Sequence, residues 1–193
     1  MLSEYGGTGF PTLMFLDAEG HKLFRPEGRD VGSFEKARDR SQEFLELVAK
    51  AEQGDAKAKV AAFRQQLELG WFGAAEARER LAGLGKISRK DRQAIERLLV
   101  ATEVRELAKE AGRDLAKRRE AGKRLAEMWR NGQVPEDKRL LVSYWGLIAD
   151  HAEAIGDKKL MKKVLKEADK TVKSDYRGRQ LVKELEQRYK NMR

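Results

Sequence analysis

The 193-residue chain has no cysteine. This absence excludes disulfide bonds, thiolate metal sites and cysteine nucleophiles, so the chain cannot carry out thiol–disulfide chemistry by itself. It also has only three prolines, and aromatic residues make up 7% of it. Few helix breakers together with abundant Ala, Leu, Glu, Lys and Arg predict a mostly helical protein.

Long hydrophobic runs are also missing. A membrane-spanning helix needs roughly 20 apolar residues, whereas one of the longest runs here is Leu13 to Leu16. No signal-peptide pattern follows Met1. We therefore expect a soluble chain with no membrane partner. Its compartment stays open: a bacterial-type cytoplasm, or the periplasm if an export signal lies upstream.

Charge is plentiful but uneven. The chain carries a formal net charge of +9, and 38% of its residues are charged. Residues 1–33 contain three Lys or Arg against five acids, whereas residues 156–193 contain thirteen against six. Most of the excess thus lies in the last two predicted helices. This pattern fits either a surface for an acidic partner or an ordinary solvated lysine-rich face. The residues of that candidate patch are Lys158, Lys159, Lys162, Lys163, Lys166 and Lys170.

The first part of the chain has a strand-like pattern. Residues 12–17 are apolar on both alternating faces, a turn follows at 18–20, and residues 21–25 form a more polar stretch that stops at Pro26. Such a pattern predicts a β-hairpin whose first strand is covered on both sides and whose second is an edge strand.

Every later segment predicts helix. Ser33 is the expected cap of the first, which runs to Lys50 or beyond. The remaining helices are expected after Asp55, over 74–84, over a long segment from Ser88 to Trp129, from Pro135 to Ile155, and over 158–172 and 175–191. Gly112 or Gly122 is expected to kink or split the long segment.

Two helix pairs share a partial pattern of offsets. The later pair places Trp145, Ile148, Ala149, Ala152, Gly156, Met161, Leu165 and Ala168 on one repeating set. Aligning Gly70 with Gly156 gives a weaker match, in which Lys59, Gln66 and Glu79 replace the tryptophan, an alanine and a leucine. This spacing resembles the tetratricopeptide helix hairpin. The resemblance implies a degenerate array of helical hairpins with a concave protein-binding face, rather than a regular solenoid.

The segment from Glu4 to Gly20, with its glycine loop, its Phe-Pro-Thr triplet and its Asp-Ala-Glu-Gly turn, resembles the passage into the fourth strand of thioredoxin-fold proteins. The resemblance covers residues 1–53 and implies a C-terminal helix after the hairpin. It also implies that Pro11 is the family's cis-proline and that Phe10, Pro11 and Thr12 contact an extended substrate segment. We therefore divide the chain into a partial thioredoxin-like segment, 1–53, and a helical-hairpin domain, 54–193.

The family's Cys-x-x-Cys half is absent, and the chain begins just before the glycine loop. We interpret the sequence as a fragment of a longer protein, with a half-domain put to another use as the alternative. The missing neighbour leaves the strand 12–17 unpaired on one side. This predicts either a homodimer through that strand or cover from the protein's own helices.

Other side chains offer no catalytic constellation. His21 and His151 stand without metal-ligand spacing, and Gly6-Gly7-Thr8-Gly9 lacks the context of a phosphate loop. Glu103 is interpreted as one of many acids that stabilise an exposed helix by pairing at helical spacing. The aromatic residues Trp71, Trp129, Tyr144 and Trp145 are expected in the core. We expect no cofactor and no metal.

Three functions compete on this basis. The first is a non-catalytic protein-interaction or scaffold region of a thioredoxin-like protein. The second is a fragment of a thiol–disulfide oxidoreductase whose catalytic half is missing. The third is a basic helical protein that binds nucleic acid independently of sequence, with a steep salt dependence.

Overall fold

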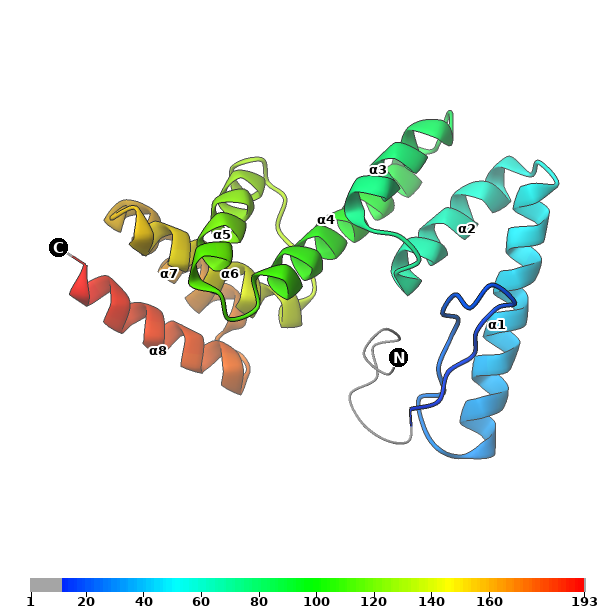
Figure 1. Cartoon of the computed structure of the whole chain (residues 1–193), viewed down its shortest axis with the longest axis horizontal. Coiled ribbons are helices and arrows are strands. Elements are labelled where there is room, and N and C mark those ends of the chain that lie inside the picture. Colours follow the sequence, from blue (N-terminus) through cyan, green and yellow to red (C-terminus); the bar gives the residue numbers. More distant parts are fainter. Residues whose placement is uncertain (1–11, 193) are drawn as a thin grey trace. The chain divides into compact units, whose positions relative to one another are not determined.

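A computed structural model describes residues 12–192 of the chain. This part is mostly helical, as the composition predicts, and contains no β-strand. Its eight helices are drawn in Figure 1: α1 (Val31–Glu52), α2 (Ala56–Leu69), α3 (Ala74–Gly83), α4 (Arg89–Ala111), α5 (Leu115–Arg130), α6 (Lys138–Ala154), α7 (Lys158–Val172) and α8 (Tyr176–Asn191).

The chain forms two compact units, Met1–Leu98 and Leu99–Arg193. The division falls within α4, and the boundary expected at residues 53 and 54 lies inside the first unit. In the first unit α1 packs against α2. The second unit is built around α6, which packs against α5, α7 and α8.

Aspartate caps begin most of the helices. The side chain of Asp55 accepts hydrogen bonds from the backbone N–H groups of Lys57 and Ala58, and Asp114 does the same for α5. Ser88 and Asp91 bond to each other at the start of α4, with the N–H of Asp91 donating to the Ser88 hydroxyl at 3.0 Å. Each cap satisfies N–H groups that the first turn leaves without a partner, and the predicted starts after Asp55 and at Ser88 are confirmed.

Two predicted helix starts need correction. The cap of α1 is Asp30, and the Ser33 hydroxyl donates to its carboxylate at 2.6 Å from within the first turn. Likewise α6 begins at Lys138 behind the cap Asp137, so Pro135 precedes the helix rather than opening it. In both places a nearby aspartate takes the capping position.

The predicted β-hairpin is not formed. Residues 12–25 turn back on themselves, but only one isolated antiparallel bridge forms, between Leu16 and Lys22. The two arms also share backbone hydrogen bonds, from the N–H groups of Phe15, Leu23 and Asp17 to the carbonyls of Phe24, Phe15 and His21, but these do not extend into regular strands. The side chains of the second arm pack on the rest of the first unit. Leu23 is buried, and Phe24 meets Phe44 of α1 edge to face at 6.3 Å. The Lys22 carbonyl accepts a hydrogen bond from the Trp71 indole at 2.6 Å. The second arm is therefore held by these side-chain contacts together with a few backbone hydrogen bonds to the first arm.

The long segment after Ser88 divides at Gly112, as one of the two predictions has it. Gly112 has a positive φ of 48°, a conformation that favours glycine. The turn ends at Asp114, which caps α5. The other candidate, Gly122, lies inside α5, where it allows close packing rather than a break.

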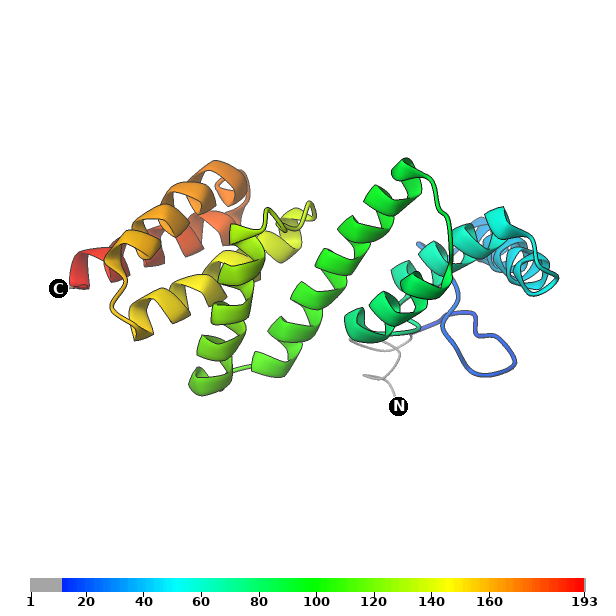
Figure 2. The same cartoon turned by 90° about the horizontal axis from the view of Figure 1, so that it is seen from above.

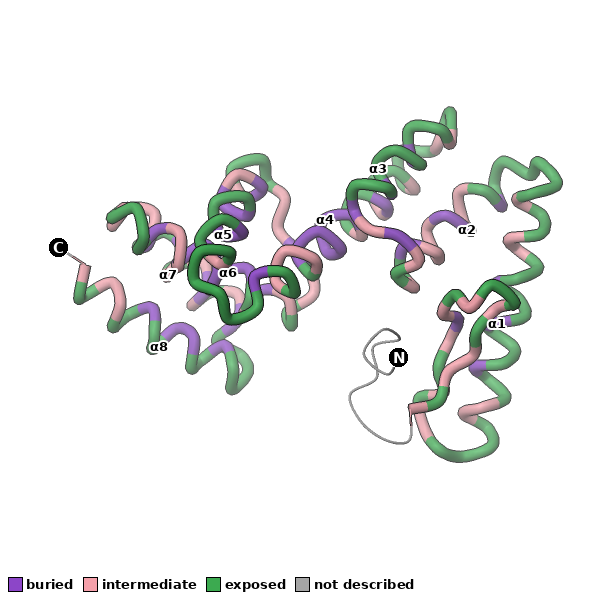
Figure 3. The backbone as a smooth tube through the Cα atoms, viewed as in Figure 1, coloured by how far each residue is buried: buried purple, intermediate pink, exposed green. Residues whose placement is uncertain are grey.

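The second unit has one continuous hydrophobic core. Figure 2 shows α5, α6 and α7 as neighbouring helices, and Figure 3 shows buried residues along their facing sides. The largest fully buried side chains of this core are Tyr144, Trp145, Leu125, Met128, Leu147, Ile148, Met161 and Leu185. This core fixes which side of α7 faces outward.

Candidate functional site

Helix α7 has two opposite faces. Met161, Val164, Ala168 and Val172 point into the core and are fully buried. Gly156, with a φ of 67°, turns the chain ahead of the helix, and Asp157 caps it by accepting a hydrogen bond from the Leu160 N–H at 2.8 Å. A sharp turn and a cap thus set where the helix starts, and the buried stripe sets its rotation.

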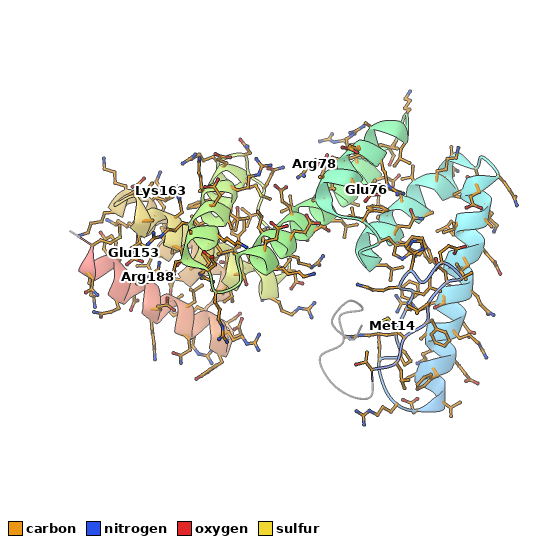
Figure 4. The ribbon with its side chains drawn as sticks, viewed as in Figure 1. Met14, Glu76, Arg78, Glu153, Lys163 and Arg188 are labelled. Atoms are coloured by element: carbon orange, nitrogen blue, oxygen red, sulfur yellow. The ribbon has the colours of Figure 1, made fainter. Side chains whose placement is uncertain are left out.

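The opposite side of α7 carries a continuous row of lysines, all of them exposed. Because these lysines recur at intervals of three and four residues, they share one side of the helix. We call this set the lysine face; Figure 4 labels one member, Lys163, and the members are Lys159, Lys162, Lys163, Lys166, Lys170 and Lys173.

Five of the six predicted patch residues belong to the lysine face. Lys158 does not, because its ammonium group donates a hydrogen bond to the Met192 carbonyl at 2.6 Å and lies 5.4 Å from the ring centre of Tyr189. It therefore helps to hold the end of α8. Lys173, at the C-cap of α7, continues the row beyond Lys170, where the predicted patch ends.

A groove of about 720 Å³ runs beside the lysine face. It lies between α7 and α8 and is lined by Lys159, Lys162, Lys163, Leu165, Lys166, Asp169, Lys173 and Glu186. Leu165 is half-buried and packs against the core. The groove therefore combines a cationic wall with an apolar residue.

The cationic wall is partly neutralised at one end only. The Lys173 ammonium lies 2.8 Å from the Asp169 carboxylate, and this hydrogen bond raises the pKa of Lys173 above its ordinary value. Glu186 lines the groove from α8. No ion pair within residues 12–192 engages Lys159, Lys162, Lys163 or Lys166. The positive charge thus concentrates toward the start of α7.

The residues assigned to substrate contact by the thioredoxin resemblance are mostly outside the described chain. Phe10 and Pro11 lie in that part, and Thr12 is the first described residue, half-buried. Their role stays a prediction. Thr12 belongs to the first unit, whereas the lysine face belongs to the second.

A cluster in the first unit includes Asp17, Glu19 and His21, whose side-chain donor atoms lie within 4.8 Å of one another. Asp17 closes the turn: its carboxylate accepts hydrogen bonds from the N–H groups of Glu19 and His21 and lies 2.9 Å from His21 Nδ1. Burial opposes ionisation, but the hydrogen bonds from His21 hold the pKa of Asp17 below its usual range. These contacts occupy both carboxylate oxygens, which assigns the cluster to turn formation.

A charge network joins three helices of the second unit. Asp150 of α6 lies 2.7 Å from Arg118 of α5 and 2.8 Å from Arg188 of α8. Arg188 also lies 2.7 Å from Glu153, which Figure 4 labels beside it. Burial works against the charge on Arg188, but its bonds to Asp150 and Glu153 raise its pKa. Because the arginines are engaged by carboxylates, the network holds helices together. Its members lie far apart in the sequence, so no local pattern predicts the network.

Two of the four aromatic residues expected in the core are fully buried. Tyr144 and Trp145 are buried, whereas Trp71 and Trp129 are half-buried. The Trp145 indole donates to the Thr171 hydroxyl at 2.9 Å, and the Tyr144 hydroxyl donates to the Gln133 carbonyl at 2.9 Å. Burial raises the pKa of the Tyr144 phenol well above its usual range. The polar atoms of Tyr144 and Trp145 thus form structural hydrogen bonds within the core.

Comparisons with protein-family models, with curated proteins and with solved structures find no significant match. Among the described residues, no helix has the length and apolar character needed to cross a bilayer. Among the described residues, the lysine face and its groove are the feature that best suggests a binding role.

Proposed function

We propose that this chain is a non-catalytic interaction or scaffold region that binds an acidic protein partner through the lysine face. The main support for this proposal is that α7 has one fully buried face and an opposite, exposed face of six lysines. The buried side alone explains the packing of α7. The lysines therefore contribute a concentrated positive potential that steers and orients an acidic surface.

The composition of the face favours a protein over a nucleic acid. Helix α7 contains no arginine and no aromatic residue, whereas arginine forks grip phosphates and aromatic rings stack on bases. The concentration of charge in residues 156–193 keeps sequence-independent nucleic-acid binding as the second candidate.

The helical part supports the resemblance to tetratricopeptide hairpins as a proposal. Ala149 and Ala152 of α6 and Ala168 of α7 are fully buried, and Gly156 makes the turn between these two packed helices. Small residues at such positions let antiparallel helices approach closely. We therefore retain a degenerate helical-hairpin scaffold as the architecture that presents the lysine face.

The thioredoxin-like origin of residues 1–53 also stays a proposal, as does an oxidoreductase parent. A Cys-x-x-Cys encoded in frame upstream of Met1 would support that parent. The homodimer through residues 12–17 stays a prediction too. Leu13 and Leu16 are 50% and 43% exposed, while the other arm packs on the protein's own helices. Light scattering would measure the oligomeric state.

The proposed function is tested by titrating the full chain with fluorescently labelled poly-glutamate, poly-glutamine and a single-stranded oligonucleotide matched in charge to poly-glutamate. The test variant replaces Lys159, Lys162, Lys163 and Lys166 by Gln. The control replaces four other exposed lysines of the second unit, Lys109, Lys117, Lys123 and Lys138, so both variants lose the same net charge.

We expect poly-glutamate binding that falls about tenfold or more in the test variant and much less in the control. Four surface ion pairs at about 0.2–1 kcal/mol each support a loss of this order. Equal losses in the two variants would assign the binding to net charge and overturn the proposal. Tighter binding of the oligonucleotide through the same lysines would favour the second candidate.

A further inference from the structure

The groove beside the lysine face offers more than charge. Leu165 lies on α7 between the buried stripe and the lysines, and it is half-buried in the wall of the groove. The aliphatic stems of lysine side chains extend such an apolar surface while their ammonium groups stay in water. A partner that presents only carboxylates would leave this surface uncovered.

The positive charge is also distributed in a defined way. Lys159, Lys162, Lys163 and Lys166 span eight residues at the start of α7, and the seven steps from first to last cover about 10 Å along a helix axis. Toward the other end, Lys173 is paired with Asp169 at 2.8 Å. Carboxylates spread over about 10 Å therefore match the first half of the groove, whereas Asp169 and Glu186 offset the positive charge in the second half.

We infer that the groove between α7 and α8 binds a short acidic segment of a partner protein that inserts a large apolar side chain against Leu165. This inference rests on the proposed function and names the partner's chemistry. The carboxylates of the segment pair with the four lysines at the start of α7. The volume of the groove, about 720 Å³, lies within the range of about 300–1,000 Å³ typical of ligand pockets.

The alternatives make distinct predictions. A phosphate backbone would use the lysines but would gain nothing from Leu165. A purely acidic protein surface would behave in the same way. Selectivity for acidic segments that carry an apolar residue is therefore the property that separates this inference from simple charge attraction.

The experiment uses two labelled twelve-residue peptides of equal charge, one with glutamates and leucines and one with each leucine replaced by glutamine. Both are titrated against the full chain by fluorescence anisotropy. We expect the leucine peptide to bind about tenfold more tightly, because a leucine that packs against Leu165 removes apolar surface from water. The Leu165→Gln variant should lose this preference and keep the weaker affinity for the glutamine peptide.

A matched control is Leu69→Gln, which changes a half-buried leucine of the first unit and should retain the preference. Leu165 packs against the core, so replacing it could also disturb the fold. A second measurement therefore uses the unaltered chain. Backbone amide shifts in an NMR titration with the leucine peptide should change along α7 and α8. Changes confined to other helices would contradict the inference.

The outcomes also separate the two proposals. Equal affinity for both peptides would overturn the apolar contact and leave acidic-partner binding intact. Failure of both peptides to bind at low salt would overturn the proposed function and the inference with it. Binding that survives the replacement of Lys159, Lys162, Lys163 and Lys166 by Gln would place the peptide elsewhere and would also reject the inference.

Discussion

Gly122 of α5 lies directly against the backbone carbonyl of Leu147 in α6, so close that a Cβ on Gly122 would overlap the carbonyl oxygen. Gly178 of α8 lies against the Val172 carbonyl in the same manner. The crowding atoms belong to backbone, which cannot rotate away as a flexible side chain does. These two glycines therefore set the separation between packed segments of the second unit.

Replacing Gly122 by Ala should destabilise the second unit. Overpacking of this kind costs typically about 1–3 kcal/mol, which exceeds the gain of up to about 1 kcal/mol from helix propensity. Hydrogen exchange at α5 and α6 amides should accelerate accordingly. The control is Gly146→Ala in α6, whose new methyl would meet Leu181 Cδ1 at an ordinary 3.6 Å. Similar exchange in both variants would contradict the close contact.

The Tyr144 hydroxyl is the second testable contact. Tyr144 is fully buried, and its hydroxyl donates to the part-buried Gln133 carbonyl in the loop before α6. Tyr144→Phe keeps the ring but leaves that acceptor without its donor, so we expect a loss of about 1 kcal/mol. The urea midpoint measures this loss. An unchanged midpoint would show that water replaces the phenol at this carbonyl.

Trp71 holds the arm formed by residues 12–25. Its indole donates to the Lys22 carbonyl, stacks on His21 at 4.4 Å and meets Phe44 edge to face at 5.4 Å. Trp71→Leu removes all three contacts, so hydrogen exchange and proteolysis within residues 12–25 should accelerate. Trp129→Leu, which alters a half-buried tryptophan of the second unit, should leave this arm unchanged. Equal protection in both variants would show that other contacts hold it.

The sequence predicts the helices better than the contacts between them. Apolar periodicity and turn residues locate α2, α3 and α7 closely, because both signals are local. The two predicted strands of the hairpin do not form: residues 12–25 pair at one isolated bridge with a few backbone hydrogen bonds, and the second arm is held by long-range contacts to Phe44 and Trp71 that no local pattern predicts. Glu103 shows the same limit. Helical spacing suggests an exposed pair, but the structure buries it beside Arg124, at 2.9 Å and 21 positions away.

The candidate site follows the same division. The lysine row is visible from spacing alone, since its members share one helix. The groove needs α8, and the placement of Lys158 needs the end of α8, so neither can be derived from α7. Similarly, Arg188 reaches Asp150 from 38 positions away. Long-range pairing of this kind leaves no local periodic signal.

His151 of α6 provides a prediction of pH dependence. Burial, followed by repulsion from Arg130 and Lys123, lowers its pKa below the ordinary 6.5 despite Glu120 and Asp157 nearby. The folded state therefore binds its proton less readily than the unfolded state. Well above pH 6.5 the imidazole is neutral in both states and does not affect stability. As the pH falls below 6.5 the unfolded state takes up the proton first, and stability declines.

An NMR titration of the His151 ring should give a midpoint below 6.5 in the folded chain and near 6.5 in concentrated urea. The urea midpoint of unfolding should fall as the pH drops from 7 toward 5. Below that, protonation of the capping aspartates adds to the loss, because Asp55 and Asp114 have lowered pKa values from their backbone hydrogen bonds. His151→Gln should reduce the decline of the urea midpoint between pH 7 and 5. The control His21→Gln leaves His151 in place and should keep that contribution to the decline. A folded midpoint at or above 6.5 would mean that water or Glu120 compensates the burial of the imidazole.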